Sequence, residues 1–464
     1  MHRSRWSSFA ALAATALALS AAPVALRAQT PTVTVFEGAR LLTGDGGVIE
    51  NSAFIVANDR VTGVGRRGEL PVPPGAVRVD LAGKTVMPAL VDDHVHMGYR
   101  IGTSFSADNY TRANLLDMLD RYAFYGVAAI LETGTGRGEL PYRVRAEAHS
   151  GARYLTAGSG FGMPDAGPGG AMHDSAYGVT TEEEARRDVR ELASHKPDMV
   201  KIWVDDRNGT VEKLKPNLYR AIIDEAHKNN LRVMAHVFAL DDVKDLVRAG
   251  IDGFAHMVRD KDVDDELLAL LKQHPDVFFV ETLWGERRAL YTAKPAWVDD
   301  PVLRQAFGAE DIKQLAEQLS PNPSADPKAV QRAREFAATN LRNTAKLYAA
   351  GARISLGTDT GGVSGGEFFG LGSHVELELL VTRAGLTPMQ AIMAGTHTAA
   401  GILGLDDLGM VGPGKSADFL VLDANPLDDI ANTRRISKVY LRGQEIPRAA
   451  LSAKWQANGA QPGK

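Results

Sequence analysis

Two hydrophobic patterns alternate along the middle of the chain. Short apolar runs rich in β-branched and aromatic residues are typical of buried strands. Such runs occupy residues 88–96, 126–134, 152–158, 198–206, 231–237, 252–258, 277–283 and 353–359. Amphipathic segments typical of helices lie between them, among them 181–195, 217–230 and 240–250. Thr181 and Glu184 have the capping-box spacing, which predicts that a helix begins there.

This alternation gives eight strands, each but the last followed by a helix before the next strand. Eight such units close into a barrel, so we predict an α/β fold with a (β/α)8 TIM barrel over residues 88–405. The active site of such a barrel lies at the carboxyl ends of its strands. Polar residues at those ends are therefore the first candidates for function.

The two ends of the chain have a different, β-rich pattern. The apolar pieces are residues 32–42, 52–65, 77–88, 416–426 and 436–446. Asn58 and Asp59 form a hairpin-type turn between two of these runs. We therefore predict one small β-sandwich domain built from residues 29–87 and 406–450, followed by a tail over 451–464.

The first 28 residues have the features of an export signal. Arg3 and Arg5 give a positive start, residues 9–26 are apolar, and a cut after Ala28 would release the mature chain. An uncleaved membrane anchor is the alternative. We expect a secreted or periplasmic protein that does not associate with a membrane once the signal is removed.

Composition narrows the class of partner. The chain has 464 residues with 44% hydrophobic content, which is ample for a large core. Its formal net charge of −5 argues against nucleic acid as a partner. It has no cysteine, hence no disulfides. A small molecule is the expected partner, and assembly into a homo-oligomer stays open.

An unusual set of side chains lies on the predicted strands and at their carboxyl ends. The set is His94, His96, Lys201, His236, His256 and Asp359. A single strand histidine is more often a packed core residue, but six separate explanations of that kind are improbable together. Imidazoles and a carboxylate that converge in one cavity are ligands of a divalent metal, and this nitrogen and oxygen set favours zinc over calcium or magnesium.

The pattern resembles the amidohydrolase superfamily of metal-dependent hydrolases. The shared features are H-x-H after the first strand, Lys on the fourth, His on the fifth and sixth, and Asp on the eighth. The segment "GLTPMQAIMAGTHTAAGILGLDDLGMVGPGKSADFLVLDANPL" is similar to the family's usual ending. The branch with imidazolonepropionase-like proteins, exported prolidase-type dipeptidases and ochratoxin-type amidases is the most similar, and it has the bridging Lys.

The resemblance implies two divalent ions, with His94, His96 and Asp359 on the buried one and His236 and His256 on the exposed one. It also implies that Lys201 bridges both as a carbamate formed with carbon dioxide. An unmodified ammonium cannot ligate a cation and would repel it. The alternative is a Lys201 paired with Asp205 or Asp206 beside a single metal ion.

This centre predicts hydrolysis of an amide C–N bond. Two metal ions activate a water as hydroxide and polarise the substrate carbonyl, and Asp359 moves the proton to the departing nitrogen. We expect a dipeptide or an N-acyl amino acid, aryl amides included, as substrate. The alternatives are a carbamate, cyclic imide, lactone or ester at the same metals, or an exported metal-binding protein without catalysis.

The residues that contact the substrate are less well determined by the sequence. The glycine-rich loop 158–178 predicts an irregular lid, in which His173 either donates to the substrate or faces solvent. Arg207 would either clamp a substrate carboxylate or pair with a neighbouring acid on the surface. Tyr99 and Trp203 would line an aromatic wall, although Trp203 would equally fill the barrel.

Overall fold

The computed structural model describes residues 33–148, 150–320, 325–362 and 368–459, so the predicted signal over 1–28 lies outside the described residues. Within these ranges, eight parallel strands form the barrel, which confirms the predicted TIM barrel. They are β8 (Leu90–Val95), β11 (Val127–Glu132), β12 (Arg153–Thr156), β15 (Val200–Val204), β16 (Val233–Val237), β17 (Gly253–Ala255), β18 (Phe278–Glu281) and β19 (Arg353–Leu356).

Backbone hydrogen bonds close the barrel at its two seams. Strands β8, β11 and β12 pair in one sheet, and β15 to β19 pair in another, all in parallel. At one seam the Asp359 N–H donates to the His94 carbonyl over 2.8 Å. At the other the Asp198 N–H donates to the Thr156 carbonyl over 2.9 Å. The first seam therefore joins two strand ends that carry predicted ligands.

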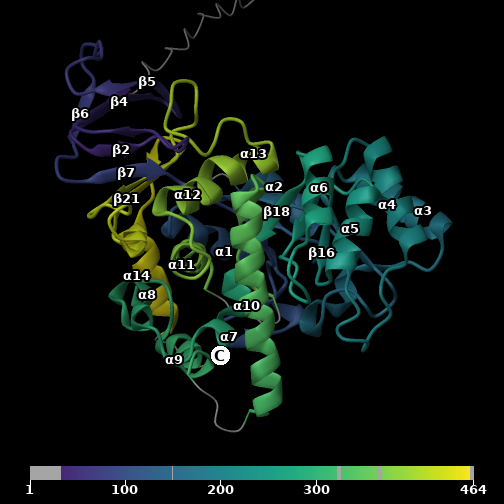
Figure 1. Cartoon of the computed structure of the whole chain (residues 1–464). Helices are drawn as coiled ribbons and strands as arrows, with labels where there is room; N and C mark the ends of the chain where they lie inside the picture. Colours follow the sequence, from purple (N-terminus) through teal and green to yellow (C-terminus); the bar gives the residue numbers. More distant parts are fainter. Residues whose placement is uncertain (1–32, 149, 321–324, 363–367, 460–464) are drawn as a thin grey trace, which may run out of the picture.

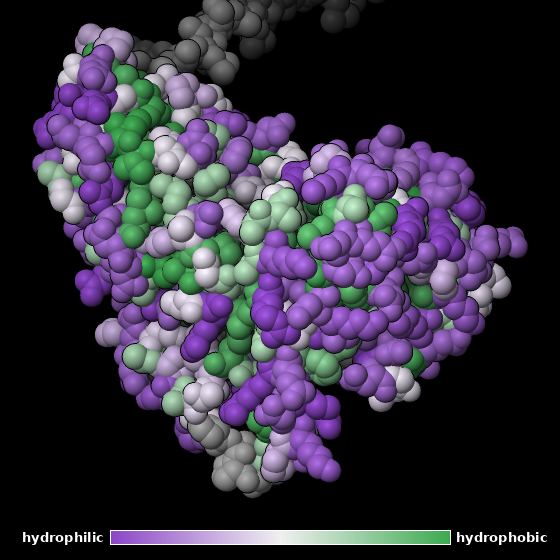
Figure 2. Space-filling view, viewed as in Figure 1, coloured by the Kyte–Doolittle hydropathy of each residue, from purple (hydrophilic) through white to green (hydrophobic). Residues whose placement is uncertain are grey.

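Amphipathic helices cover the outside of the barrel, and Figure 2 shows hydrophilic side chains over the outer helices on the right of the view. The three predicted helices are confirmed as α3 (Glu182–Ser194), α4 (Pro216–Lys228) and α5 (Leu240–Arg248). The predicted capping box is present, since the Glu184 N–H donates to the Thr181 hydroxyl and the Thr181 N–H donates to the Glu184 carboxylate. The others around the barrel are α1 (Arg112–Phe124), α2 (Leu140–Glu147), α6 (Asp265–Gln273), α11 (Leu371–Thr382), α12 (Pro388–Met393) and α13 (Ala399–Leu403).

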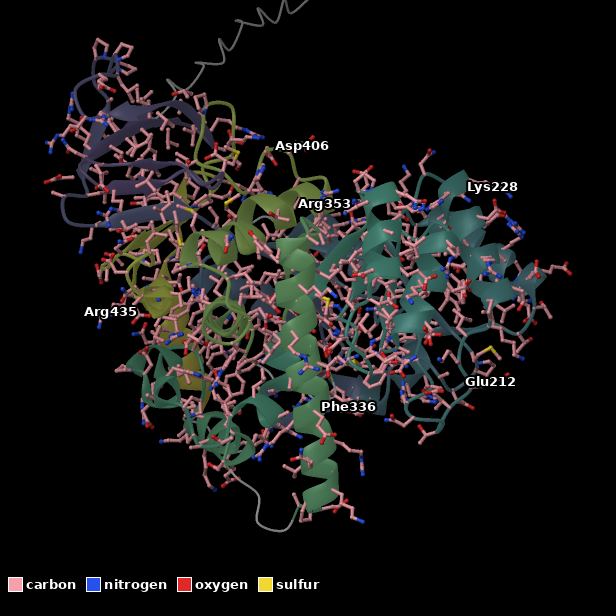
Figure 3. The ribbon with its side chains drawn as sticks, viewed as in Figure 1. Glu212, Lys228, Phe336, Arg353, Asp406 and Arg435 are labelled. Carbon is pink, nitrogen blue, oxygen red and sulfur yellow. The ribbon has the colours of Figure 1, made fainter. Side chains whose placement is uncertain are left out.

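A long helical insertion separates β18 from β19. Its elements are η3 (Leu283–Glu286), α7 (Arg287–Leu290), η4 (Ala296–Asp299), α8 (Pro301–Arg304), α9 (Ala309–Gln318) and α10 (Pro327–Ala349). Helix α10 runs along the front of the barrel in Figure 1. Its Phe336, labelled in Figure 3, packs edge to face on Phe238 beyond β16, with ring centroids 4.9 Å apart.

The strands at both chain ends form two sheets beside the barrel (Figure 1, purple and yellow). One sheet has the order β5 (Arg60–Arg66), β4 (Ser52–Ala57), β1 (Val33–Glu37), β6 (Val77–Asp80). The other has the order β22 (Gln444–Glu445), β21 (Ile436–Leu441), β20 (Phe419–Leu422), β7 (Thr85–Pro88), β2 (Arg40–Leu42), β3 (Val48–Ile49). Strand β7 leads through Ala89 directly into β8, so the second sheet anchors the strand that carries His94.

The predicted C-terminal tail needs correction. Residues 448–459 form helix α14 (Arg448–Gly459), and Trp455 is buried on it. The ring of Trp455 packs against Phe124 and under the Arg121 guanidinium, and these contacts hold helix α14 against the barrel helix that carries both residues. No helix among the described residues is long and apolar enough to cross a bilayer.

Candidate metal centre

A cavity of about 330 Å³ lies at the carboxyl ends of the barrel strands. All of the predicted ligands line it, namely His94, His96, Lys201, His236, His256 and Asp359. Side chains from the loop after β12 and from the end of β15 line the rest. The strands thus bring together residues that are 265 positions apart at the extremes, from 94 to 359.

His94, His96 and Asp359 form the tightest group in the cavity. Asp359 Oδ1 lies 3.0 Å from His96 Nε2 and 3.6 Å from His94 Nε2. Each of the three residues offers one ligand atom, and these atoms lie within 4.8 Å of one another. Two imidazole nitrogens and a carboxylate oxygen at this separation suit a divalent cation such as zinc.

His256 and His236 continue the group along the cavity wall. The ring centroid of His256 lies 4.8 Å from that of His94 and 4.6 Å from that of His236. Burial lowers the pKa of both His236 and His256, which favours the neutral imidazole that a metal requires.

Each of these two rings has one nitrogen held by an oxygen. His236 Nε2 lies 3.2 Å from Asp205 Oδ2, and His256 Nδ1 lies 2.6 Å from the Thr282 hydroxyl. Burial alone would raise the pKa of Asp205, but the hydrogen bonds from His236 and from the Arg207 backbone, together with the positive charge of Arg259, lower it to about 2. Asp205 is therefore an anion that fixes the His236 ring.

Lys201 is buried in the cavity wall, and its Nζ has no hydrogen-bond partner among the described residues. The alternative pairing with Asp205 or Asp206 is therefore not formed. Burial lowers the pKa of Lys201 to about 7, so much of the amine is neutral near neutral pH. Both ring nitrogens of His94 are also buried without a hydrogen-bond partner. Buried polar atoms are normally satisfied, and these are the donor atoms a metal centre uses.

A buried carboxylate lies behind His96. The carboxylate is that of Glu132, and Thr135 connects it to the histidine. Nδ1 of His96 lies 3.1 Å from the Thr135 hydroxyl, and this hydroxyl lies 2.6 Å from Glu132 Oε1. Thr156 donates to the other oxygen of Glu132 over 2.8 Å. Sequence reasoning missed Thr135 and Thr282, and it considered Asp205 only as the ion-pair partner of a lysine or arginine. The signal that marks all three is their position just beyond the ends of β11, β15 and β18.

Arg207 and Trp203, two of the predicted substrate contacts, line the cavity. The Arg207 guanidinium donates to the Gly167 carbonyl and forms no ion pair with a described carboxylate, so the surface pairing considered for it is absent. Met172 also lines the cavity. Arg207 is thus a cation at the rim of a cavity with an apolar wall.

Two other predicted contacts are not in the cavity wall. His173 is exposed and interacts with Asp165 and Asp174, because it lies on the outer side of a short helix, η2 (Gly170–Ser175). Tyr99 is only 1% exposed, and its hydroxyl donates to the Thr135 carbonyl over 2.6 Å. His173 thus takes the solvent-facing alternative, whereas Tyr99 does not line the cavity as predicted. The loop is not irregular throughout, since β13 (Phe161–Gly162), η2 and β14 (Tyr177–Gly178) lie within it.

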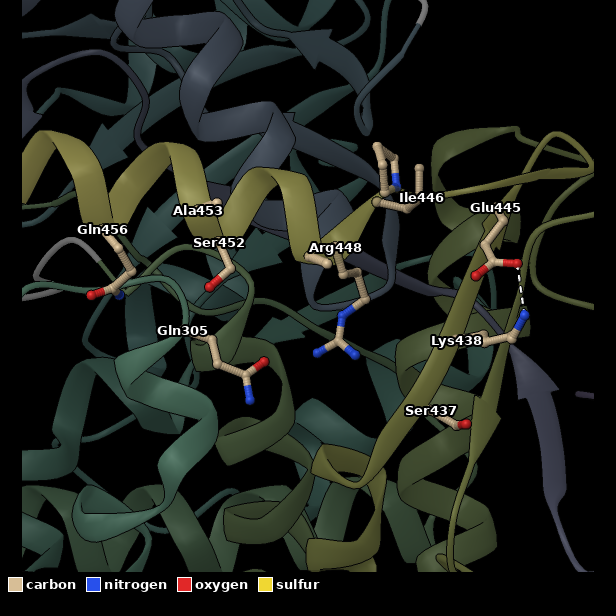
Figure 4. Close-up of a pocket in the computed structure, with 11 residues that line it drawn as sticks. Gln305, Ser437, Lys438, Glu445, Ile446, Arg448, Ser452, Ala453 and Gln456 are labelled. Atoms are coloured by element: carbon tan, nitrogen blue, oxygen red, sulfur yellow. Dashed lines mark hydrogen bonds and ion pairs between the residues drawn. The ribbon is translucent and has the colours of Figure 1, made fainter.

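A larger cavity of about 680 Å³ lies between α14 and strands β21 and β22 (Figure 4). The described residues that line it include no histidine. Its Lys438 and Glu445 pair with each other over 2.9 Å, as the dashed line in Figure 4 shows. None of the described residues that line this cavity has a buried polar side-chain atom without a hydrogen-bond partner, in contrast to His94 and Lys201 at the barrel mouth.

Comparison with known proteins agrees with this geometry. Residues 85–446 match the amidohydrolase family. Ochratoxinase from Aspergillus niger is 26% identical over 445 residues, covering 86% of this chain and 82% of that protein. Imidazolonepropionase from a Ruegeria species is 27% identical over 430 residues, covering 88% and 96%. A candidate prolidase from Bifidobacterium longum has a similar structure, with a TM-score of 0.72, 25% identity, and coverage of 93% of this chain and 99% of that one.

Proposed function

The chain belongs to the amidohydrolase family and is a hydrolase of carbon–nitrogen bonds; we propose that it cleaves the amide bond of a dipeptide or N-acyl amino acid, aryl amides included, with two divalent ions. The observation that carries the proposal is the convergence of four histidines, Lys201 and Asp359 on one cavity. Relatives named ochratoxinase and a candidate prolidase support an amide as the bond that is cleaved.

The residues present fit a metal centre. His94, His96 and Asp359 would hold one ion, and His236 and His256 the other. Lys201 would bridge them after its amine, which has no hydrogen-bond partner, reacts with carbon dioxide to form a carbamate. We propose zinc, because imidazole and carboxylate ligands suit it. When bound, the ions supply Lewis acidity toward the carbonyl and make water more acidic.

The chain's own groups perform the remaining tasks. Asp359 accepts the proton of the attacking water and delivers it to the leaving nitrogen; its side chain is 19% exposed, so it can reach the cavity. Arg207 at the rim binds the substrate carboxylate. Trp203 and Met172 contact the apolar part of the substrate and exclude water from it.

A substrate panel tests the proposed bond. The purified protein would be assayed with N-acyl amino acids, dipeptides and aryl amides beside lactones, aryl carbamates and esters. We expect higher kcat/KM for substrates with an amide next to a free carboxylate, and an Arg207→Met variant should raise KM for those alone. Preference for lactones or carbamates would contradict the dipeptidase-type assignment, and no hydrolysis of any member would favour a non-catalytic metal-binding protein.

We also propose that the protein is exported and acts in the periplasm or outside the cell. The support is the positively charged and apolar start of the sequence, with a cut after Ala28. Fractionation followed by mass spectrometry of the N-terminus tests this. A chain beginning near Gln29 in the exported fraction is expected, whereas an intact Met1 in a membrane fraction would show an uncleaved anchor.

A further inference from the structure

The hydrogen bonds behind His96 have one consistent direction when Glu132 is ionised. With Glu132 ionised, both of its oxygens can only accept hydrogen bonds, and Oε1 accepts the backbone N–H of Thr135 over 2.6 Å. The Thr135 hydroxyl lies 2.6 Å from the same oxygen, so it must donate its single proton there. Its lone pairs then face His96 Nδ1 at 3.1 Å, and this nitrogen must be the donor. The proton of a neutral His96 is therefore on Nδ1.

This direction leaves His96 Nε2 with a free lone pair. That nitrogen faces the cavity and lies 3.0 Å from Asp359 Oδ1, and two electron-pair donors at this separation require a shared cation, a metal ion or a proton, between them. A ligating histidine needs this tautomer, and the partner of the other nitrogen sets it. We propose that Thr135 and Glu132 are positioning residues that hold His96 in the metal-binding tautomer and ring orientation.

The surroundings hold this pair rigidly. Glu132 is fully buried, and the Thr156 hydroxyl donates to its second oxygen over 2.8 Å. The Tyr99 hydroxyl donates to the Thr135 carbonyl over 2.6 Å, which explains why a tyrosine is buried here. Gly134, with φ of +85°, brings the turn so close to Lys201 that a Cβ would lie 2.8 Å from its side chain. The turn after β11 thus supports two candidate ligands at once.

The inference rests on the proposed metal centre, and its test measures metal affinity as well as activity. Zinc affinity of the full chain would be measured by competition with a chromophoric chelator. Thr135→Val keeps the shape of the side chain but removes the acceptor of His96 Nδ1, so affinity should fall by about 10- to 100-fold. Thr135→Ser keeps the hydroxyl and should restore it to near the wild-type value.

Thr156→Val provides a matched control. It removes a hydroxyl from the same buried carboxylate, but this hydroxyl does not contact His96. We expect it to lower the thermal unfolding midpoint of the metal-free protein, with a much smaller fall in zinc affinity than Thr135→Val gives. Equal affinity losses in Thr135→Val and Thr156→Val, or no loss in Thr135→Val, would overturn the positioning role. A wild-type protein that binds no zinc would instead overturn the proposed function.

Discussion

At the residue scale, two candidate ligands have unusual backbone angles. Asp359 has φ of 55° and His256 has φ of 71°, both in the left-handed region. Each such residue costs about 1–3 kcal/mol and persists only where neighbours impose it. Here the Asp359 N–H is held by the His94 carbonyl at 2.8 Å and the His256 N–H by the Val280 carbonyl at 3.0 Å. This backbone conformation directs both side chains from the strand ends into the cavity.

Asp359→Asn tests the proton transfer without disturbing this backbone. Asn tolerates positive φ as well as Asp does, so the thermal unfolding midpoint of metal-free protein should change little. Loss of the acid–base group should lower kcat by about 100- to 10,000-fold. Steady-state kinetics on the best amide substrate measures this. Asp276→Asn, on a fully exposed carboxylate, is the control; a fully active Asp359→Asn would defeat the mechanism.

The buried His374 makes the free energy of unfolding depend on pH. Burial lowers the pKa of His374 to about 4, and its Nε2 donates to the Tyr125 carbonyl over 2.7 Å. The unfolded chain takes up this proton from a pKa of 6.5 downward, but the folded protein does so only near 4. Stability is therefore complete above pH 6.5 and falls by up to about 3 kcal/mol as the pH drops to 4.

His374→Gln should remove this part of the acid sensitivity, because the amide can still donate to the carbonyl without taking up a proton. Urea unfolding near neutral pH and near the lower limit of this window measures the free energy in both proteins. His227→Gln, at a half-exposed histidine on the surface, is the control and should behave as wild type. Equal acid sensitivity in His374→Gln and wild type would refute the assignment.

The sequence predicts the ligands better than their supports. His94, His96 and Asp359 occur at strand ends, where period-two alternation and barrel topology together fix their direction. Thr135 and Asp205 act through single hydrogen bonds to residues 39 and 31 positions away, which leave no periodic trace. The sequence does not fix the positions of Tyr99 and His173 for a related reason: whether a loop side chain faces the cavity depends on the tertiary path of its loop.

At the element scale, strands were easier to predict than the C-terminal helix. Each barrel strand is a compact apolar run, so all eight could be read directly. Helix α14 has a weakly apolar sequence, and only its packing partners stabilise it. Trp455 contacts Phe124 and Arg121, and its Nε1 donates to Asp117 over 2.9 Å. All three partners belong to helix α1, which lies more than 300 positions before Trp455 in the sequence.

Trp455→Ala should therefore destabilise the protein strongly. Truncating a buried Trp typically costs about 3–5 kcal/mol, and the lost ring here also leaves Asp117 without one donor. Lys454→Ala, at the half-exposed neighbour that pairs with the same carboxylate, should cost no more than about 1 kcal/mol. Urea unfolding compares the two. Similar, small losses in both variants would show that α14 contributes little to stability.

At the scale of the whole molecule, the β domain and the barrel meet at a close contact beside β11. Gly126 has φ of +77°, and a Cβ there would lie 2.0 Å from the Leu420 side chain of β20. Its carbonyl accepts the Leu90 N–H over 2.9 Å, at the point where β8 begins. The β domain thus packs against the base of the first two barrel strands and fixes the strand that leads to His94.

Gly126→Ala tests this junction in a double-mutant cycle with Leu420→Ala. The single Gly126→Ala variant suffers both left-handed strain and the clash, so it should lose more than about 2 kcal/mol of unfolding free energy. Because Leu420→Ala removes the clashing atoms, the cost should fall by about 1–3 kcal/mol in that background. Gly404→Ala, with φ of +70° and no atom within 4 Å, measures the strain alone. An additive cycle would show that the two residues do not meet.

The central claim is that the buried cluster at the barrel mouth holds the metal ions on which amide hydrolysis depends. Metal analysis of the full-length mature protein, done together with the amide assay before and after chelation, tests it most directly. We expect two divalent ions per chain, loss of hydrolysis when they are removed, and recovery when zinc is returned with bicarbonate. Undiminished hydrolysis by protein that elemental analysis shows to be free of metal would contradict the claim.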